Sequence, residues 1–219
     1  MHVGILGGTG PAGRGLAARL ASVGIEATIG SRSKDRALET CEAIAERWPQ
    51  RELPLNAGDN SQAASADVVV VATPWDSAAP TAGSVRDLLA GKVVISMANA
   101  LAKVGNEFQP LVPPRGSVAA SVAAFVPDSL VAAAFHHLPA KELADLDHPI
   151  ESDVLICSDH AYATEVTSEL VRLIPGLRPL DSGTLSNAAP IEAFAAVLLQ
   201  LNIKYKTRAA VRLTGIDLP

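Results

Sequence analysis

Residues 2–15 read HVGILGGTGPAGRG, a short apolar run followed directly by closely spaced glycines. The run HVGIL has the length and composition of a buried strand, and Gly8, Gly10 and Gly13 then fit the spacing G-x-G-x-x-G. Apolar residues recur at helical spacing through residues 11–23. The stretch therefore predicts a strand, a tight glycine turn and a helix, in that order.

Such a turn is suited to binding an anion. Backbone N–H groups at a glycine turn can approach a pyrophosphate closely, and the helix that follows presents its positive end to the same group. A glycine turn that binds nothing is the alternative interpretation. Because the strand before the glycines and the helix after them are both present, the sequence favours a dinucleotide site.

A second way of reading the glycines points to short-chain dehydrogenases. Residues 9–15 also fit T-G-x-x-G-x-G, the spelling used by those enzymes, which need a Tyr-x-x-x-Lys pair for proton transfer. Tyr162 and Tyr205 are followed four residues later by Val166 and Ala209. The catalytic pair is missing, so this interpretation loses most of its support.

The kind of dinucleotide is predicted from the end of the second expected strand. An Asp or Glu there would bind the ribose hydroxyls of NAD, whereas arginine and small polar groups accept a 2′-phosphate. This chain has Ser31 and Arg32 at that position, with Arg36 just beyond. A guanidinium forms paired bonds to phosphate, so the sequence favours NADP. A solvated helix start is the alternative role for these charges.

Short β-rich runs alternate with alanine-rich helical stretches along the whole chain. The expected strands are residues 2–6, 26–30, 53–57, 67–73, 92–97, 130–135, 153–159 and 176–183. Most are continuously apolar, as parallel strands covered on both faces are. We predict an α/β fold with a doubly wound, mostly parallel Rossmann-type sheet, in which residues 1–150 form the NADP-binding core and residues 151–219 a small C-terminal α/β extension that closes the site.

The composition of the chain argues against nucleic acid and membranes as its partners. The chain has 219 residues, 48% of them hydrophobic and 19% charged, and a net charge of −5, which gives no general attraction to nucleic acid. No apolar run approaches the roughly 20 residues that span a bilayer, and no basic leader precedes the first strand. Cys41 and Cys157 lie far apart, which suits a reducing compartment. A cytoplasmic protein without nucleic-acid or membrane partners is expected.

Five segments together carry a family resemblance: GILGGTGPAGRGLAARLASVG, IGSRSKDRA, TPWDSA, HHLPA and RPLDSGTLSNAAPIE. In this order, from the first strand to the last helix, the chain resembles the NADP-dependent oxidoreductases of coenzyme F-420, the 8-hydroxy-5-deazaflavin carrier. The resemblance implies that the protein is an enzyme whose cofactors are NADP and coenzyme F-420. It implies direct hydride transfer between the nicotinamide ring and carbon 5 of the deazaflavin.

The same resemblance suggests which residues hold NADP. Gly8, Gly10 and Gly13 form the turn, and Thr9, Gly10, Pro11 and Ala12 would border the pyrophosphate. Ser31, Arg32 and Arg36 would bind the 2′-phosphate. Thr73, Pro74 and Trp75 follow the fourth strand, and Met97, Ala98 and Asn99 would line the nicotinamide end. Trp75 could instead be a core aromatic residue.

The deazaflavin is expected against HHLPA and SGTLSN. The resemblance gives His136 a contact with the reacting ring, with Leu138 and Pro139 as an apolar platform, and Ser186 and Asn187 as donors to the ring carbonyls. A packed histidine and a simple helix cap are the alternatives for His136 and for the Ser-Asn pair. Successive strand residues point to opposite faces, so His136 and His137 are not expected to share a metal ion.

Three expectations stay open at the level of sequence. Basic residues could meet the charged tail of the coenzyme or simply end a helix in solvent: Lys141, Lys204, Lys206, Arg208 and Arg212. The apolar helix around 193–201 could pair with a second copy, giving a homodimer, or belong to the core. Another NADP-linked reductase and a non-catalytic NADP sensor remain alternative functions.

Overall fold

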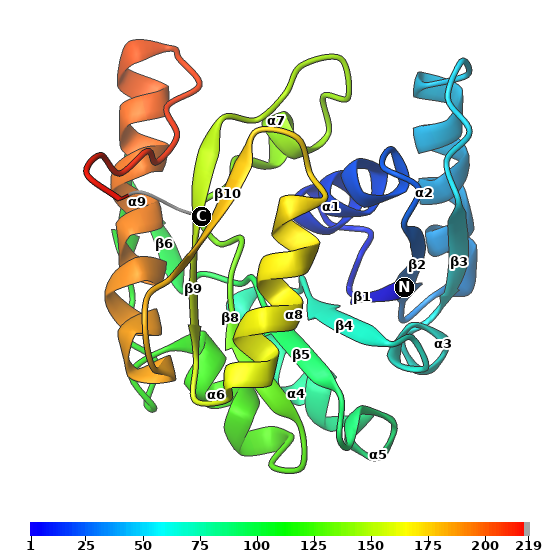
Figure 1. The fold of residues 1–219 in the computed structure, drawn as a ribbon, viewed down its shortest axis with the longest axis horizontal. Helices are drawn as coiled ribbons and strands as arrows, with labels where there is room; N and C mark the ends of the chain where they lie inside the picture. Colours follow the sequence, from blue (N-terminus) through cyan, green and yellow to red (C-terminus); the bar gives the residue numbers. More distant parts are fainter. Residues whose placement is uncertain (217–219) are drawn as a thin grey trace.

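The computed structural model describes residues 1–216, which form one eight-stranded sheet, a separate hairpin and helices on both sheet faces (Figure 1). The strands are β1 (His2–Leu6), β2 (Glu26–Ser31), β3 (Leu55–Asp59), β4 (Val68–Val71), β5 (Val93–Ser96), β6 (Leu101–Val104), β7 (Glu107–Pro110), β8 (Leu130–Ala133), β9 (Ser152–Ser158) and β10 (Leu177–Asp181). The helices are α1 (Pro11–Ala21), α2 (Lys34–Arg47), α3 (Asn60–Ala64), α4 (Trp75–Gly83), α5 (Arg86–Leu89), α6 (Val118–Phe125), α7 (Ala140–Leu143), α8 (Ala161–Arg172), the 3-10 helix η1 (Leu185–Asn187) and α9 (Ala188–Tyr205).

The sheet order is β10-β9-β8-β5-β4-β1-β2-β3. Every neighbouring pair is parallel except β8 and β9, which are antiparallel. β1 lies at the centre of the first half, with Val3 opposite Ala27 of β2 and Val68 of β4. The prediction of a doubly wound, mostly parallel Rossmann-type sheet is confirmed.

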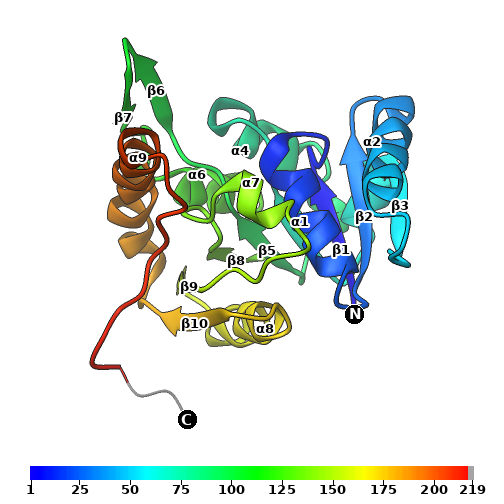
Figure 2. The same ribbon diagram turned by 90° about the horizontal axis from the view of Figure 1, so that it is seen from above.

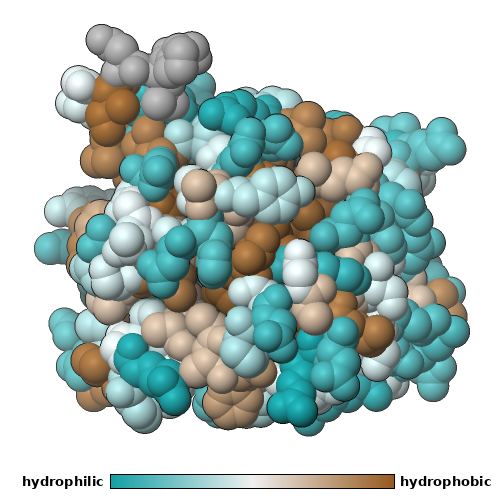
Figure 3. Space-filling model, turned by 60° about the horizontal axis from the view of Figure 1, so that its bottom comes forward, coloured by the Kyte–Doolittle hydropathy of each residue, from teal (hydrophilic) through white to brown (hydrophobic). Residues whose placement is uncertain are grey.

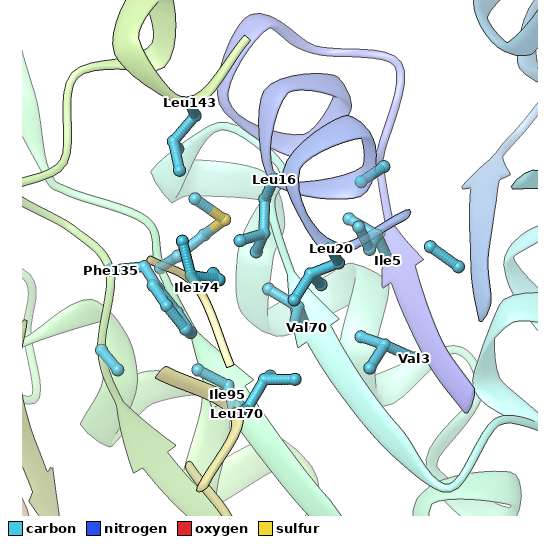
Figure 4. Packing of buried hydrophobic residues seen from close by; sticks show 14 of the residues in the cluster. Val3, Ile5, Leu16, Leu20, Val70, Ile95, Phe135, Leu143, Leu170 and Ile174 are labelled. Atoms are coloured by element: carbon cyan, nitrogen blue, oxygen red, sulfur yellow. The ribbon is translucent and has the colours of Figure 1, made fainter. Parts of the chain in front are cut away.

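Alternate residues of the central strands supply two cores. In β4, Val68 and Val70 pack with α1, α2, α7 and α8, whereas Val69 and Val71 pack with α3, α4, α5 and α6 on the other face. Figure 4 shows the first core, where Leu16 and Leu20 of α1 lie over the strands. Because both faces are covered, the strands read as continuous apolar runs.

The chain reverses between β8 and β9. Their connection, residues 134–151, contains only the four-residue helix α7 and returns to the same edge of the sheet, so β9 runs antiparallel to β8. Buried Arg19 of α1 holds this connection by donating to the carbonyl oxygens of Glu142 (2.6 Å) and His148 (3.1 Å). The sequence predicted that the sheet continues past residue 150, and β9 and β10 do pair onto it.

Two local expectations differ from the structure. The strand expected to reach Phe135 ends at Ala133, and His136 and His137 lie in a turn in which Phe135 has φ 65°. The argument from alternating strand faces therefore does not apply to these two histidines. The hairpin β6–β7 was not predicted; it stands beside α9 (Figure 2).

The face of the molecule turned forward in Figure 3 carries hydrophobic patches broken up by hydrophilic side chains. Within residues 1–216, no helix is both long enough and apolar enough to cross a bilayer.

Candidate functional site

The residues predicted to bind ligands lie mostly at one edge of the sheet. β1, β2, β4, β5 and β8 are parallel, so the segments that follow them meet at their shared carboxyl edge. In open α/β sheets this edge is where ligands bind. Two cavities are found there, on either side of the first turn of α1.

The glycine turn is shaped by close backbone packing. Gly7 has φ +67°, and a Cβ placed on it would lie 2.3 Å from the side chain of Thr73. A Cβ on Gly13 would lie 2.8 Å from the Cα of Gly8, so α1 can approach the end of β1 this closely only with glycine at position 13. Gly13 thus has the packing role that the fingerprint gives to its third glycine.

Gly10 has a different role. A Cβ there would have no neighbour nearer than 3.8 Å, so the fold itself does not require a glycine at this position. Gly10 is the N-cap of α1, lines the first cavity and precedes Pro11, the first residue of the helix. The space above it suits a ligand that approaches the backbone closely, and the unpaired N–H groups of the first helical turn suit an anion.

The first cavity has a volume of about 470 Å³. Predicted residues that line it are Thr9, Gly10, Ser31, Arg32, Arg36, Thr73 and Pro74. Ser33 caps α2 by accepting a hydrogen bond from the Arg36 backbone, and Ser31 accepts one from the Ser33 backbone, which shapes the loop. The exposed side chains of Arg32 and Arg36 lie at the same end of the cavity wall as this loop. A phosphate group would find cations, hydroxyl groups and backbone donors together.

Further residues of the first cavity were not predicted. They are Gly7, Ser33, Asn60, Ala72, Ser77 and Thr81. Asn60 opens α3 directly after β3, and its Oδ1 accepts a hydrogen bond from the Gly7 backbone at 3.3 Å. A search for polar residues directly after each parallel strand would have found Asn60. Ser77 and Thr81 required knowledge that α4 starts at Trp75.

The second cavity, of about 180 Å³, is lined from both halves of the chain. Predicted residues that line it are Ala12, Met97, Asn99, His136, Leu138 and Pro139. The others are Phe135, His137, Ala140, Ala195, Leu198, Leu199 and Asn202. Four of these belong to α9, whose side chains form a wall that sequence spacing alone could not assign to this site.

His136 is buried, with 4% of its surface exposed, and both ring nitrogens lack a hydrogen-bond partner within residues 1–216. Burial, with a smaller contribution from His137, lowers the pKa of His136 to about 3. The imidazole is therefore neutral at physiological pH and offers one N–H donor and one acceptor. An unpartnered polar ring at the wall of a cavity fits a polar group of a bound ligand.

Asn99 is oriented by the same turn. Its side-chain amide donates to the backbone oxygen of His136 at 2.7 Å, and its Oδ1 is buried without a partner in the described chain. Thr73 Oγ1 is likewise buried and unpartnered at the wall of the first cavity. These unsatisfied atoms occur beside the two cavities, which supports the fit of polar ligands to both.

Several predicted residues line neither cavity. Trp75 packs partly against the second core, which corresponds to the core alternative for this residue. Ala98 is buried in the same core. Pro11 is exposed at the start of α1.

Ser186 and Asn187 lie elsewhere. Both are exposed in η1, which follows β10, and β10 runs antiparallel to β8. They are therefore at the opposite edge of the sheet from the turn that holds His136. Asn187 donates to the Ser182 carbonyl at 2.7 Å, and the Ser186 hydroxyl lies 2.7 Å from that of Thr184.

Two of the basic residues considered for the coenzyme tail have protein partners. Arg208 pairs with Glu142 and Asp145, each at 3.1 Å, and Arg212 pairs with Asp153 at 3.1 Å. Lys141, Lys204 and Lys206 are exposed. Within residues 1–216, no group of His, Cys, Asp or Glu side chains is arranged to hold a metal ion.

Comparison with protein families gives a match over residues 2–100 to the family described as "NADP oxidoreductase coenzyme F420-dependent". The matched part contains the glycine turn and the Ser31–Arg36 loop. The second cavity draws most of its wall from later residues.

Curated relatives extend the similarity over the whole chain. It is 36% identical to the F420-dependent NADP reductase of Methanothermobacter marburgensis, covering 99% of each chain. Identity to the F420-dependent NADP reductase of Methanocaldococcus jannaschii is 37%, covering 100% of each. A crystal structure of a protein from an Arthrobacter species has the same fold, with a TM-score of 0.80 at 23% identity, over 97% of this chain and 98% of that one.

Proposed function

This chain belongs to the family of coenzyme F420-dependent NADP reductases, and on that premise we propose that it transfers a hydride between NADP(H) and the 8-hydroxy-5-deazaflavin coenzyme F-420. The observation that carries the proposal is the pair of cavities on either side of the first turn of α1. One has the donors and cations that a phosphorylated nucleotide needs. The other is largely apolar and has unpartnered polar atoms, as a site for two stacked rings needs.

The first cavity would hold NADP(H). The N-terminus of α1 and the open space above Gly10 would receive the pyrophosphate, and Ser31, Arg32 and Arg36 would bind the 2′-phosphate. Thr73 and Asn60 line the same cavity and can fix the nucleotide's orientation. The nicotinamide would then extend past Ala12 toward Met97 and Asn99.

The second cavity would align the two rings. Hydride transfer requires the donor and acceptor carbons in face-to-face contact and water excluded, because the carriers themselves supply the redox chemistry. Met97, Leu138 and Leu198 exclude water, and neutral His136 can offer an N–H to the deazaflavin. When NADPH is the donor, it gives up a hydride and becomes NADP⁺, and the deazaflavin also takes up a proton from solvent.

Ser186 and Asn187 are not included in this site. Asn187 is the residue that precedes α9, but its side chain makes no capping hydrogen bond to the helix and instead donates to the Ser182 carbonyl, so the two side chains hold the loop before the helix together. α9 then runs back along the sheet and contributes Ala195, Leu198, Leu199 and Asn202 to the second cavity. We propose that residues 151–219 act in this way, as an extension that closes the deazaflavin site of the core formed by residues 1–150.

The decisive experiment mixes the protein with NADPH and oxidised coenzyme F-420 and follows the visible absorbance of the deazaflavin. We expect the absorbance to fall at a rate proportional to enzyme concentration. Binding of NADPH without any fall would indicate a nucleotide sensor. Faster NADPH oxidation with a free flavin than with coenzyme F-420 would indicate a different reductase of the same fold.

We also propose a homodimer that forms through α9. Phe194, Val197, Leu201 and Tyr205 recur at helical spacing, and all four are exposed. Beside this stripe, α9 and the hairpin β6–β7 line a groove of about 410 Å³ that includes Phe108. An apolar stripe and groove on a surface indicate a protein contact.

We further propose a cytoplasmic location, because the free thiols Cys41 and Cys157 suit a reducing compartment.

A further inference from the structure

His137 is the other histidine of the HHLPA turn, and neither the family resemblance nor the proposed function gives it a role. It lines the second cavity with 4% of its surface exposed. Its ring centroid is 6.4 Å from that of His136, and the two rings are tilted by 54°. The two imidazoles thus face the same region from neighbouring positions of one turn.

The tautomer of His137 is set by its hydrogen bond. Nε2 lies 2.6 Å from the backbone carbonyl oxygen of Asp153. A carbonyl oxygen can only accept, so Nε2 carries the hydrogen. Burial lowers the pKa of His137, and the ring is therefore neutral at physiological pH. Its other nitrogen, Nδ1, then has a lone pair and no hydrogen, and it is buried without a partner in the described chain.

The position of the Asp153 carbonyl is itself strongly restrained. The Asp153 carboxylate is fully buried and accepts two hydrogen bonds from Arg178, at 2.7 and 2.8 Å. It also accepts bonds from Arg212 at 3.1 Å and from the Leu213 backbone at 2.6 Å, while the Asp153 N–H donates to Val211. The segment after α9 thereby anchors the residue that orients His137.

We propose that His137 is a further ligand-binding residue of this enzyme, whose Nδ1 accepts a hydrogen bond from a ring N–H of the deazaflavin's pyrimidine ring. This inference rests on the proposed function. A buried acceptor without a partner costs free energy, which a ligand N–H recovers. An acceptor fixed in this tautomer also rejects a carbonyl oxygen at the same point.

The alternative source of such an N–H group is the carboxamide of the nicotinamide ring. His137 follows β8, whereas Asn99 follows β5, which is one strand closer to the glycine turn. Asn99 also offers an unpartnered acceptor, Oδ1. The order of the strands therefore favours Asn99 for the carboxamide and His137 for the deazaflavin.

Two substitutions separate the functions of the two ring nitrogens. His137→Gln can keep a donor near the position of Nε2 but loses the acceptor at Nδ1, while His137→Asn keeps an acceptor near Nδ1 and loses the bond to Asp153. Dissociation constants for NADPH and for oxidised coenzyme F-420 would be measured by anaerobic titration, with melting temperatures measured in parallel. Wild-type turnover is recorded first.

His137→Gln is expected to raise the dissociation constant for the deazaflavin about tenfold, to leave that for NADPH within about twofold, and to melt near the wild type. His137→Asn is expected to melt lower but to bind the deazaflavin more tightly than His137→Gln does. Equal deazaflavin binding by His137→Gln and wild type would overturn the inference, as would equal losses in both variants or a loss of NADPH affinity alone. Absence of turnover in the wild type would instead contradict the proposed function.

Discussion

At the scale of single residues, the proposed 2′-phosphate site depends on the two arginines after β2. Arg32 and Arg36 are exposed at the wall of the first cavity, next to the Ser31 and Ser33 hydroxyls. Hydrogen bonds to charged groups contribute about 1.5–3 kcal/mol, which corresponds to a factor of roughly 10 to 100 in binding. Both arginines would exert this effect only on a ligand that has the 2′-phosphate.

Arg32→Ala is therefore expected to raise KM for NADPH about 10-fold or more and to leave KM for NADH nearly unchanged. Steady-state kinetics with both nucleotides checks this. Arg47→Ala, at the exposed end of α2 away from both cavities, serves as the control. Equal increases in KM for NADPH and NADH would show that Arg32 does not recognise the 2′-phosphate.

The lowered pKa of His136 leads to a prediction about how the stability of the protein depends on pH. Its pKa is about 3 in the folded protein because it is buried, against an ordinary value of 6.5. As pH falls, His136 therefore takes up a proton in the unfolded chain before it does so in the folded protein. The contribution of neutral, buried His136 to the free energy of unfolding is complete above pH 6.5 and is lost as pH falls toward 3. At pH 5 the loss is about 2 kcal/mol. Urea unfolding at pH 7 and pH 5 should show that the free energy of unfolding falls more for the wild type than for His136→Gln. Equal falls in the two proteins would contradict the lowered pKa of His136.

The same neutral state limits the chemistry that His136 can carry out in the proposed reaction. A ring that is not protonated near neutral pH can donate a hydrogen bond but does not supply a proton as an imidazolium. His136→Ala should lower the rate of hydride transfer only modestly. Complete loss of activity in a folded variant would mean that His136 takes part in proton transfer.

At the scale of secondary-structure elements, Glu192 connects α9 to α6. It is buried, and its carboxylate accepts hydrogen bonds from the backbone N–H groups of Val118 (2.8 Å) and Ala119 (3.0 Å) at the start of α6. Burial raises its pKa to about 7, although the two backbone bonds act in the opposite direction. α9 carries one wall of the second cavity, so this contact helps to hold that wall in place.

The raised pKa determines the sign of the pH effect. The unfolded chain releases the Glu192 proton near pH 4.5 and the folded protein near pH 7, so the stability contribution is present below pH 4.5 and is lost as pH rises through 7. Between pH 4.5 and pH 8, the free energy of unfolding of the wild type should fall by about 3 kcal/mol relative to that of Glu192→Gln. Urea unfolding at several pH values measures this difference, with Glu165→Gln on the exposed face of α8 as the control. A difference that does not depend on pH would contradict the assignment.

At the scale of the whole molecule, α9 stands at the opposite end of the sheet from α2 and β3 (Figure 1), and the residues of its apolar stripe are exposed. The second cavity is lined by the neighbouring face of the same helix, through Ala195 and Leu198, which are buried.

Val197→Glu is expected to convert the dimer into a monomer, because a charge in an apolar interface loses hydration without gaining a partner. Light scattering coupled to size-exclusion chromatography gives the mass directly. Leu38→Glu, which changes an exposed leucine of α2, should remain dimeric. A wild-type protein that is monomeric at micromolar concentration would refute the homodimer.

The sequence by itself determined the part of the protein around the first cavity, where NADP would bind. Residues 2–23 encode strand, turn and helix through local periodicity and glycine spacing, and the fold follows them. Ser31, Arg32 and Arg36 are close in sequence to the strand that places them, so local order was enough to bring them together. These features depend on interactions between near neighbours, which a single chain displays directly.

Tertiary structure decided the rest of the site. The reversal between β8 and β9 sends Ser186 and Asn187 to the opposite edge of the sheet and brings the later part of α9 back to His136. His137 receives its tautomer from a carbonyl 16 residues away, and Trp75 packs on a core whose members come from several elements. The direction of a strand and the partner of a buried nitrogen depend on contacts between distant segments, and no local pattern in the sequence specifies these.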